Sequence, residues 1–146
     1  MIILNNPTAI ERIADSTKVV YNPKSDVCLA RIGARGDLLG GVMFTNYCVN
    51  SIQAHLAVYH PAFFTRTFLG VAFGYPFDKL GCKKIFAPIP SNNAPSLRVA
   101  THLGFKLEVV VPEVFPDADL LVLAMKPEEC RWRLPAGTEL GDLVYG

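Results

Sequence analysis

The stretch SNNAPSLRVATHLGF, residues 91–105, carries the information that decides the fold. It begins with small polar residues, continues with apolar residues at helical spacing and ends in a Gly-Phe pair. An asparagine before such a segment caps a helix, Pro95 suits the first helical turn, and Gly104 suits the left-handed conformation that ends one. The stretch therefore predicts a short helix over residues 94–103.

The start of this helix carries more polar groups than capping requires. Asn92 and Asn93 both precede the helix, although one asparagine is enough to cap it. Ser96 lies close to one helical turn beyond Asn93. The spare asparagine and Ser96 are therefore either ligand contacts or ordinary surface residues.

The segment before this stretch predicts a strand, a helix and a second, parallel strand. Residues 49–59 alternate as a strand does, with one face formed by Ile52, Ala54, Leu56 and Val58 and the other by Gln53, His55, Ala57 and Tyr59. Residues 62–80 have an apolar helical repeat that ends before Gly81, and Pro76 should distort this helix because it lacks a backbone N–H. With a strand over residues 83–89, the three elements make a βαβ unit.

The remaining elements complete one domain. A helix is predicted over residues 8–15, with Thr8 and Glu11 at capping-box spacing. Strands are predicted over residues 27–32, 38–46, 105–111 and 120–125, the first two forming an antiparallel hairpin. Gly70 and Gly74 are expected to let helix 62–80 approach the sheet closely. Residues 1–130 are therefore expected to form one α/β domain, followed by a surface tail over residues 131–146.

The overall composition excludes several classes of protein. The chain has 146 residues, the usual length of one domain. Its 14 lysines and arginines nearly balance 13 acidic residues, so no extended basic surface for nucleic acid is expected. Its apolar stretches are shorter than the ~20 residues that span a membrane, and the opening MIIL lacks the features of a signal peptide. No membrane partner and a cytoplasmic location are therefore expected.

The four cysteines lie far apart in the sequence, at Cys28, Cys48, Cys82 and Cys130. They form no C-x-x-C pair and no histidine cluster accompanies them, so no metal site is expected. All four are expected to be buried free thiols.

The junction between strand 49–59 and helix 62–80 is a candidate anion site. In βαβ units ligands lie beyond the carboxyl end of the first strand, next to the helix N-terminus. The first turn of a helix has unpaired N–H groups and a positive dipole end, which favour a phosphate. Arg66 lies in this turn, where it either adds a positive charge to the site or points into solvent.

Residues 73–108, FGYPFDKLGCKKIFAPIPSNNAPSLRVATHLGFKLE, resemble part of the GNAT superfamily of acetyltransferases, particularly its ribosomal-protein N-acetyltransferase-like branch. That branch carries N-x-x-S, a short helix and L-G-F, which match Asn93, Ser96 and residues 103–105. Residues 27–133 also resemble small acetyltransferase-like proteins of tailed phages and prophages, through motifs at residues 76–81, 117–120 and 128–132. The resemblance implies a single-domain GNAT fold, with a mixed, mostly antiparallel sheet, a central βαβ unit and helices on both faces.

The resemblance also implies acetyl-coenzyme A as co-substrate, bound beside strand 49–59 with its pyrophosphate at the start of helix 62–80. The positions implied to contact it are Leu56, Ala57, Val58, Phe64, Thr65, Arg66, Asn93 and Ser96. The chain departs from the family at the phosphate loop, where YHPAFFTRTF at residues 59–68 replaces the usual glycine-containing motif. Backbone N–H groups can still bind phosphate there, although Phe63 and Phe64 crowd the approach.

Acetyl transfer to an amine requires a base for the amine proton and a donor that polarises the thioester carbonyl. His55 lies on the polar face of strand 49–59, near where the family often places its base, and is the first candidate. A hydrogen-bonded structural histidine is the competing interpretation, and Glu113 and His60 are alternative bases. A backbone N–H near residues 56–58 can polarise the carbonyl if the strand bulges, as GNAT strands do.

The leaving thiolate must also be tolerated or protonated. Many GNAT enzymes place a tyrosine for this purpose five residues before the Phe of L-G-F, where this chain has Ala100. The acid is then Ser96, water or absent. His102, on the helix next to L-G-F, is expected at the surface.

Two functions follow from the resemblance. The first is an N-acetyltransferase that moves an acetyl group from acetyl-coenzyme A to a primary amine, in a bacterial cytoplasm and encoded by a phage or prophage. Its acceptor is left open between a small molecule, a protein amine and a modified base. The second is a catalytically silent GNAT-fold binding or virion-associated protein, in which Phe63 or Phe64 fills the cleft beside His55. Trp132, expected to be exposed, and the apolar tail suit a homodimer contact.

Overall fold

The computed structural model describes residues 1–145, which contain a seven-stranded sheet and three α-helices. The strands are β1 (Ile2–Leu4), β2 (Val27–Ile32), β3 (Leu38–Thr45), β4 (Ser51–Val58), β5 (Lys84–Pro90), β6 (Lys106–Phe115) and β7 (Ala118–Met125). The helices are α1 (Pro7–Thr17), α2 (Arg66–Gly74) and α3 (Ala94–Leu103). The strand order is β1-β2-β3-β4-β5-β7-β6, and every neighbouring pair is antiparallel except β4 and β5.

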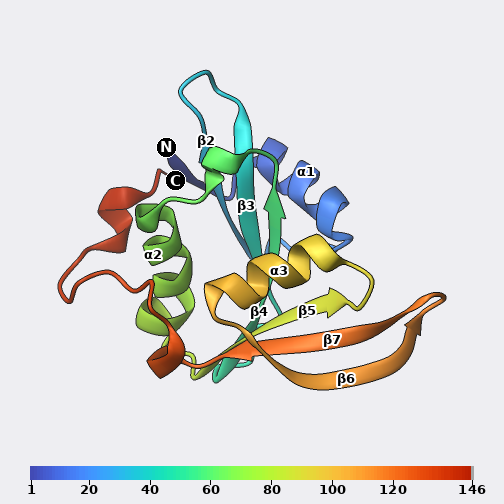
Figure 1. The fold of residues 1–146 in the computed structure, drawn as a ribbon. Helices are drawn as coiled ribbons and strands as arrows, with labels where there is room; N and C mark the ends of the chain where they lie inside the picture. Colours follow the sequence, from blue (N-terminus) through green and yellow to red (C-terminus); the bar gives the residue numbers. More distant parts are fainter. Residues whose placement is uncertain (146) are drawn as a thin grey trace.

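Helices cover both faces of this sheet (Figure 1). α1 packs on β2, β3 and β4, where Ile13, Met43 and Ala57 belong to one buried cluster. α2 and α3 contribute Phe68 and Leu103 to a larger cluster on the opposite face. The predicted α/β fold, with a mostly antiparallel sheet, a central βαβ unit and helices on both faces, is confirmed.

α1 begins earlier than the sequence pattern indicates. Asn6 caps the helix by accepting the N–H of Ala9 on its Oδ1, at 3.1 Å, and Pro7 occupies the first helical position. The predicted capping pair, Thr8 and Glu11, therefore lies inside the helix. The Asn-Pro start is stable because the proline has no N–H that would need a partner and the asparagine satisfies another.

The predicted helix over residues 62–80 is divided into three elements. They are a 3-10 turn (Pro61–Phe63), α2, and a π-helical turn (Tyr75–Lys79). In the π turn, the N–H of Leu80 donates to the carbonyl oxygen of Tyr75 at 3.0 Å. Pro76 has no N–H to continue the α-helical pattern, so the expected distortion is confirmed, whereas the prediction of one continuous helix is wrong.

The described part of the C-terminal tail, residues 131–145, packs against α2 and α3. The indole N–H of Trp132 donates to the carbonyl oxygen of Leu103 at 2.8 Å, and this side chain is half-buried. The side of α2 that carries glycines is covered by two tail leucines, with Leu134 next to Gly70 and Leu140 next to Gly74. The glycines therefore leave room for the leucine side chains of the tail and do not face the sheet. Trp132 is half-buried and not exposed. Both sequence-based expectations were wrong.

Replacing Gly70 with alanine is expected to loosen the tail, because the new Cβ would overlap the Leu134 side chain. We expect Gly70→Ala to lower the free energy of unfolding in urea by about 1–2 kcal/mol, since the displaced leucine loses buried area. Combining it with Leu134→Ala should give less than the sum of the two single losses, because the shorter side chain leaves room for the Cβ. Strictly additive losses would contradict this packing.

The edges of the sheet also differ from the prediction. β1 was not predicted, because three residues are too few to show strand alternation. β6 and β7 are longer than predicted and form an arm that extends away from the helices (Figure 1). Pro112 and Glu113, whose φ is 60°, lie within β6 where its register with β7 shifts. The pattern ended at residue 111 because Pro112 interrupts the alternation.

All four cysteines are free thiols, as predicted. Cys28 and Cys82 are buried, whereas Cys130 is half-buried and Cys48 is exposed, so burial of all four was not correct. Burial raises the pKa of the Cys28 thiol to about 11, which keeps it protonated at neutral pH.

Candidate functional site

The two parallel strands at the centre of the sheet separate along their length. β4 and β5 pair at three positions, the last of which joins Gln53 to Phe86. Beyond this pair the strands diverge, as Figure 1 shows, and residues 54–58 have no pairing with β5. We call this gap the β4–β5 opening. On its other side β4 pairs with β3 without a register shift, so the bulge expected near residues 56–58 is absent and divergence alone opens the sheet.

The two strands that border the β4–β5 opening each lead to a helix. α2 follows the carboxyl end of β4, and Thr65 caps it by accepting the N–H of Phe68 on Oγ1, at 3.1 Å. α3 follows the carboxyl end of β5, and the Oδ1 of Asn93 accepts the N–H of Ser96 at 3.3 Å. Each helix therefore follows the carboxyl end of one of the two diverging strands and offers a positive dipole end that favours an anion.

The cap of α3 identifies the spare asparagine. Asn93 is the cap, so its side-chain oxygen is already used and its NH₂ group remains available for other contacts. Asn92 is the exposed, spare residue. Ser96 is half-buried in the first turn of α3, where its own N–H is taken by the cap.

The other side chains predicted to contact the coenzyme divide between the two sheet faces. Leu56 is half-buried against the cluster under α2 and α3, whereas Ala57 is buried under α1. Val58 ends β4 and is partly exposed. At the start of α2 the structure brings together three predicted residues, Phe64, Thr65 and Arg66, of which Phe64 and Arg66 are exposed. The side chains of residues 56–58 alternate between the two faces of the sheet, so they cannot all contact one ligand. The groups of this segment that face the β4–β5 opening are its backbone N–H and carbonyl groups.

His55 is half-buried on the α1 side of β4. Its Nε2 lies 2.9 Å from the Oγ1 of Thr45, which is itself only 5% exposed. Burial lowers the pKa of His55 below its ordinary value of 6.5, and the nearby carboxylate of Asp26 partly offsets this effect. The imidazole is therefore neutral at pH 7 and can accept a proton on whichever ring nitrogen is unprotonated.

Thr45 is a site residue that the sequence analysis missed. It ends β3 and pairs with Gln53, so it meets His55 diagonally across the β3–β4 ladder. Its Oγ1 also accepts a hydrogen bond from the side-chain N–H of Asn46 at 3.3 Å. A polar residue that closes the apolar run LLGGVMFT was the available signal, but only the hairpin register connects it to His55.

The alternative bases lie elsewhere. His60 is exposed, its Nδ1 accepts the N–H of Ala62 at 3.0 Å, and it lines a pocket of about 720 Å³ beside α1. Glu113 is exposed in the β6–β7 arm, and its backbone N–H donates a hydrogen bond to Asp119 Oδ1 at 3.1 Å. His102 is exposed on α3, as expected, with its ring 6.5 Å from that of Trp132. None of these three shares the surroundings of His55.

Phe63 does not cover His55. It is fully buried in the cluster under α2, with its ring centroid 4.7 Å from that of Phe68, and so lies on the face opposite to His55. Phe64 packs edge-on against Phe63 and remains partly exposed at the start of α2.

Residues 1–145 contain neither a cluster of metal-binding side chains nor a membrane-spanning helix. Within residues 1–145, no group of three or more histidine, cysteine or acidic residues is arranged to hold a metal ion. No helix in this range is long and apolar enough to cross a membrane.

Comparison with known proteins gives matches at the level of structure. The sequence matches no protein-family model and no curated protein. The fold is similar to that of the spermidine/spermine N-acetyltransferase SpeG from Vibrio cholerae, with 17% identity, a TM-score of 0.65 and coverage of 86% of this chain and 91% of that one. A structure of the dodecameric spermidine N-acetyltransferase from the same organism matches with 16% identity, a TM-score of 0.65 and coverage of 86% and 92%.

A nourseothricin acetyltransferase also matches, with 18% identity, a TM-score of 0.61 and coverage of 74% of this chain and 69% of that one. These matches cover most of the mixed sheet and helices of this chain, with TM-scores of 0.61 to 0.65. The chain therefore has the fold of the GNAT acetyltransferases.

Proposed function

We propose that this protein is an N-acetyltransferase that transfers the acetyl group of acetyl-coenzyme A to a primary amine. The observation that carries the proposal is the β4–β5 opening, whose two strands each lead to a helix N-terminus and whose strand β4 carries a half-buried histidine, His55. The acetyltransferase activities named for the structural neighbours support the same reaction.

The residues present fit the coenzyme. Residues 54–58 have no β5 partner, so their backbone groups on that side can bond to an extended amide chain as a neighbouring strand would. The start of α2 offers Arg66 and the first helical N–H groups to a phosphate, without the glycines that are usual in this family. Asn93 and Ser96 occupy the corresponding position on α3. When bound, the coenzyme supplies an activated acetyl thioester.

His55 is the proposed base. An amine is protonated at neutral pH, so it must lose a proton before its nitrogen can form a bond to the acetyl carbon. If His55 Nε2 donates its hydrogen to Thr45 Oγ1, the lone pair of Nδ1 is free to accept that proton. Thr45 is then a positioning residue, because it fixes the tautomer and the ring orientation of His55.

The remaining groups act on the carbonyl and the departing sulfur. A backbone N–H of residues 54–58 that faces the β4–β5 opening can donate to the acetyl carbonyl oxygen as negative charge develops on it. As the carbon–sulfur bond breaks, the hydroxyl of Ser96 or a water molecule supplies the proton to the thiolate. Ala100 has no proton to donate, which leaves Ser96 as the proposed side-chain acid.

We also propose a setting for this reaction, a bacterial cytoplasm, with a phage or prophage as the source of the gene. Self-association is proposed as well, since one neighbour is described as dodecameric. Trp132 is not available for such a contact, because its indole N–H bonds to the carbonyl oxygen of Leu103 within the same chain. The proposed contact surface is instead β6, where Leu107, Val109 and Val110 are exposed.

Coenzyme binding tests the proposal directly. We expect acetyl-coenzyme A to raise the melting temperature of the purified protein and to bind measurably in calorimetry, and Arg66→Ala to weaken this binding. Turnover is then followed as free thiol released in the presence of a panel of amines. No binding at millimolar acetyl-coenzyme A would overturn the proposal. Binding without turnover on any amine would favour the catalytically silent GNAT-fold protein.

A further inference from the structure

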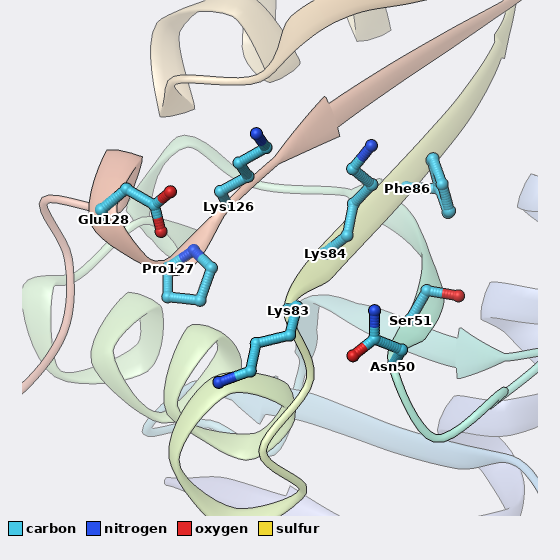
Figure 2. Close-up of a pocket in the computed structure, with 8 residues that line it drawn as sticks. All are labelled: Asn50, Ser51, Lys83, Lys84, Phe86, Lys126, Pro127 and Glu128. Carbon is cyan, nitrogen blue, oxygen red and sulfur yellow. The ribbon is translucent and has the colours of Figure 1, made fainter.

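A second pocket lies on the same side of the sheet as His55, at the closed end of the β4–β5 opening. Its volume is about 500 Å³, and it is lined by Asn50, Ser51, Lys83, Lys84, Phe86, Lys126, Pro127 and Glu128. Figure 2 shows Lys126, Pro127 and Glu128 on one side of it and Asn50 and Ser51 on the other. We call it the lysine pocket.

The register of the strands connects this pocket to His55. Ser51 pairs with Lys84 and Gln53 pairs with Phe86, so these four side chains lie on one face of the sheet. His55 follows Gln53 on the same face, about 7 Å further along β4. α1 packs on β2, β3 and β4, and Phe86 remains only half-buried. An acceptor that reaches His55 from this side can therefore also occupy the lysine pocket.

The charge of the pocket points to an anion. Three of its lining residues are lysines, from the start of β5 and the end of β7, and one is an acid, Glu128. The Nζ of Lys84 is 2.5 Å from a carboxylate oxygen of Glu108, whereas among residues 1–145 Lys83 and Lys126 form no ion pair. Since Glu128 and the paired Glu108 offset two of the three lysines, the remaining positive charge is carried by Lys83 and Lys126. Figure 2 shows their ammonium groups on different sides of the pocket.

The other lining groups suit the remainder of such a ligand. Asn50 and Ser51 offer an amide and a hydroxyl that can donate hydrogen bonds to an oxyanion. Phe86 and Pro127 present apolar surface, and the Nζ of Lys84 lies 5.4 Å from the centroid of the Phe86 ring. The pocket thus combines cationic groups with an apolar wall, which suits a short aliphatic chain that ends in a carboxylate or phosphate.

We infer that the acceptor is an amine that carries an anionic group, held in the lysine pocket while its nitrogen lies at His55. This inference rests on the proposed acetyl transfer. Along β4 the distance from Ser51 to His55 is about 13 Å, so the amine and the anion are separated by roughly 7–13 Å. A polycation such as spermidine, the substrate named for several structural neighbours, would be repelled by the lysines.

The test compares four amines that differ in the group at the far end of the chain. We expect ω-aminohexanoate and ω-aminooctanoate to bind at least 10-fold more tightly than hexylamine and spermidine, measured by calorimetry with the full-length protein at low salt. Raising the salt concentration should reduce this preference, because exposed charges are screened. Equal binding of the four amines, or tighter binding of spermidine, would overturn the inference.

Lysine variants test whether the preference for amines that end in a carboxylate arises from the lysine pocket. Lys126→Met and Lys83→Met should each reduce the preference for the acids several-fold, and the double variant should abolish it. Lys79→Met removes the same charge from the exposed end of the π turn and should leave the preference unchanged. An unchanged preference in the double variant would also overturn the inference.

Binding and turnover separate the two proposals. A preference for acidic amines without any acetyl transfer would overturn the proposed reaction and support the anion site. Acetyl transfer that does not depend on the far end of the amine would overturn the inference about the acceptor and support the reaction.

Discussion

Replacing His55 with glutamine is expected to lower kcat/KM for acetyl transfer by about 10²- to 10³-fold. A glutamine side chain can still donate to Thr45 Oγ1 from nearly the position of Nε2, but it cannot accept the amine proton. The variant should therefore keep the melting temperature of the parent protein. The rate is measured as thiol release with the best amine found in the acceptor panel.

The pH dependence of kcat/KM provides a second readout. The base acts in its neutral form, and burial lowers the pKa of His55 from its ordinary value of 6.5. The rate of the parent protein should thus rise with pH and level off with a midpoint below 6.5. The rise of kcat/KM around this midpoint should be absent in His55→Gln, because glutamine does not titrate. Thr45→Val should shift the midpoint and reduce kcat, because the ring loses the group that fixes its tautomer.

His102→Ala is the matched control for the histidine substitution. His102 is exposed on α3 and lies outside the proposed machinery, so its removal should change kcat/KM by less than twofold. If His55→Gln retains full activity while the protein is folded, His55 is a structural histidine and the base must be sought elsewhere.

Replacing Gly40 with alanine is expected to be the most destabilising of the substitutions considered. Gly40 has a φ of 151°, and a Cβ built on it would lie 2.5 Å from the carbonyl oxygen of Ala57 and 2.8 Å from the ring of Phe63. The obstacle includes backbone of the paired strand, which cannot rotate away as a side chain would. We expect the free energy of unfolding, measured in urea, to fall by about 3 kcal/mol or more.

Gly36→Ala is the control that measures the cost of a positive φ alone, without the steric overlap present at Gly40. Gly36 also has a positive φ, 83°, but a Cβ there would have no heavy atom within 4 Å. Its replacement should cost about 1 kcal/mol, the ordinary penalty for a left-handed residue with a side chain. If Gly40→Ala and Gly36→Ala lower the free energy of unfolding by similar amounts, the close contact of Gly40 with Ala57 and Phe63 is not the reason for a glycine at position 40.

Local sequence patterns predicted the elements around the site well. The β2–β3 hairpin, β5 and α3 agree closely with their predicted limits, because alternation, caps and a terminal glycine are properties of neighbouring residues. The divided helix after β4 shows the limit of this reasoning. Its apolar repeat continues through Pro76, and the choice of a π turn depends on how the following backbone packs.

Contacts between distant residues were the main source of error. The glycines of α2 form a site for Leu134 and Leu140, which lie more than sixty residues further along the chain. Nothing near Gly70 indicates this partner. The same holds for Thr45, whose contact with His55 depends on the register of two strands.

The sequence by itself determined the order of the strands from β2 to β7 and of the helices, the presence of an asparagine cap before α3, and the face of β4 that carries His55, since all three follow from spacing along the chain. Only the tertiary structure decided that β4 and β5 part after Gln53 without a bulge, and that Lys83, Lys84 and Lys126 surround one pocket. These features arise from sheet pairing between segments far apart in sequence, and pairing of that kind leaves no periodic signal in either segment.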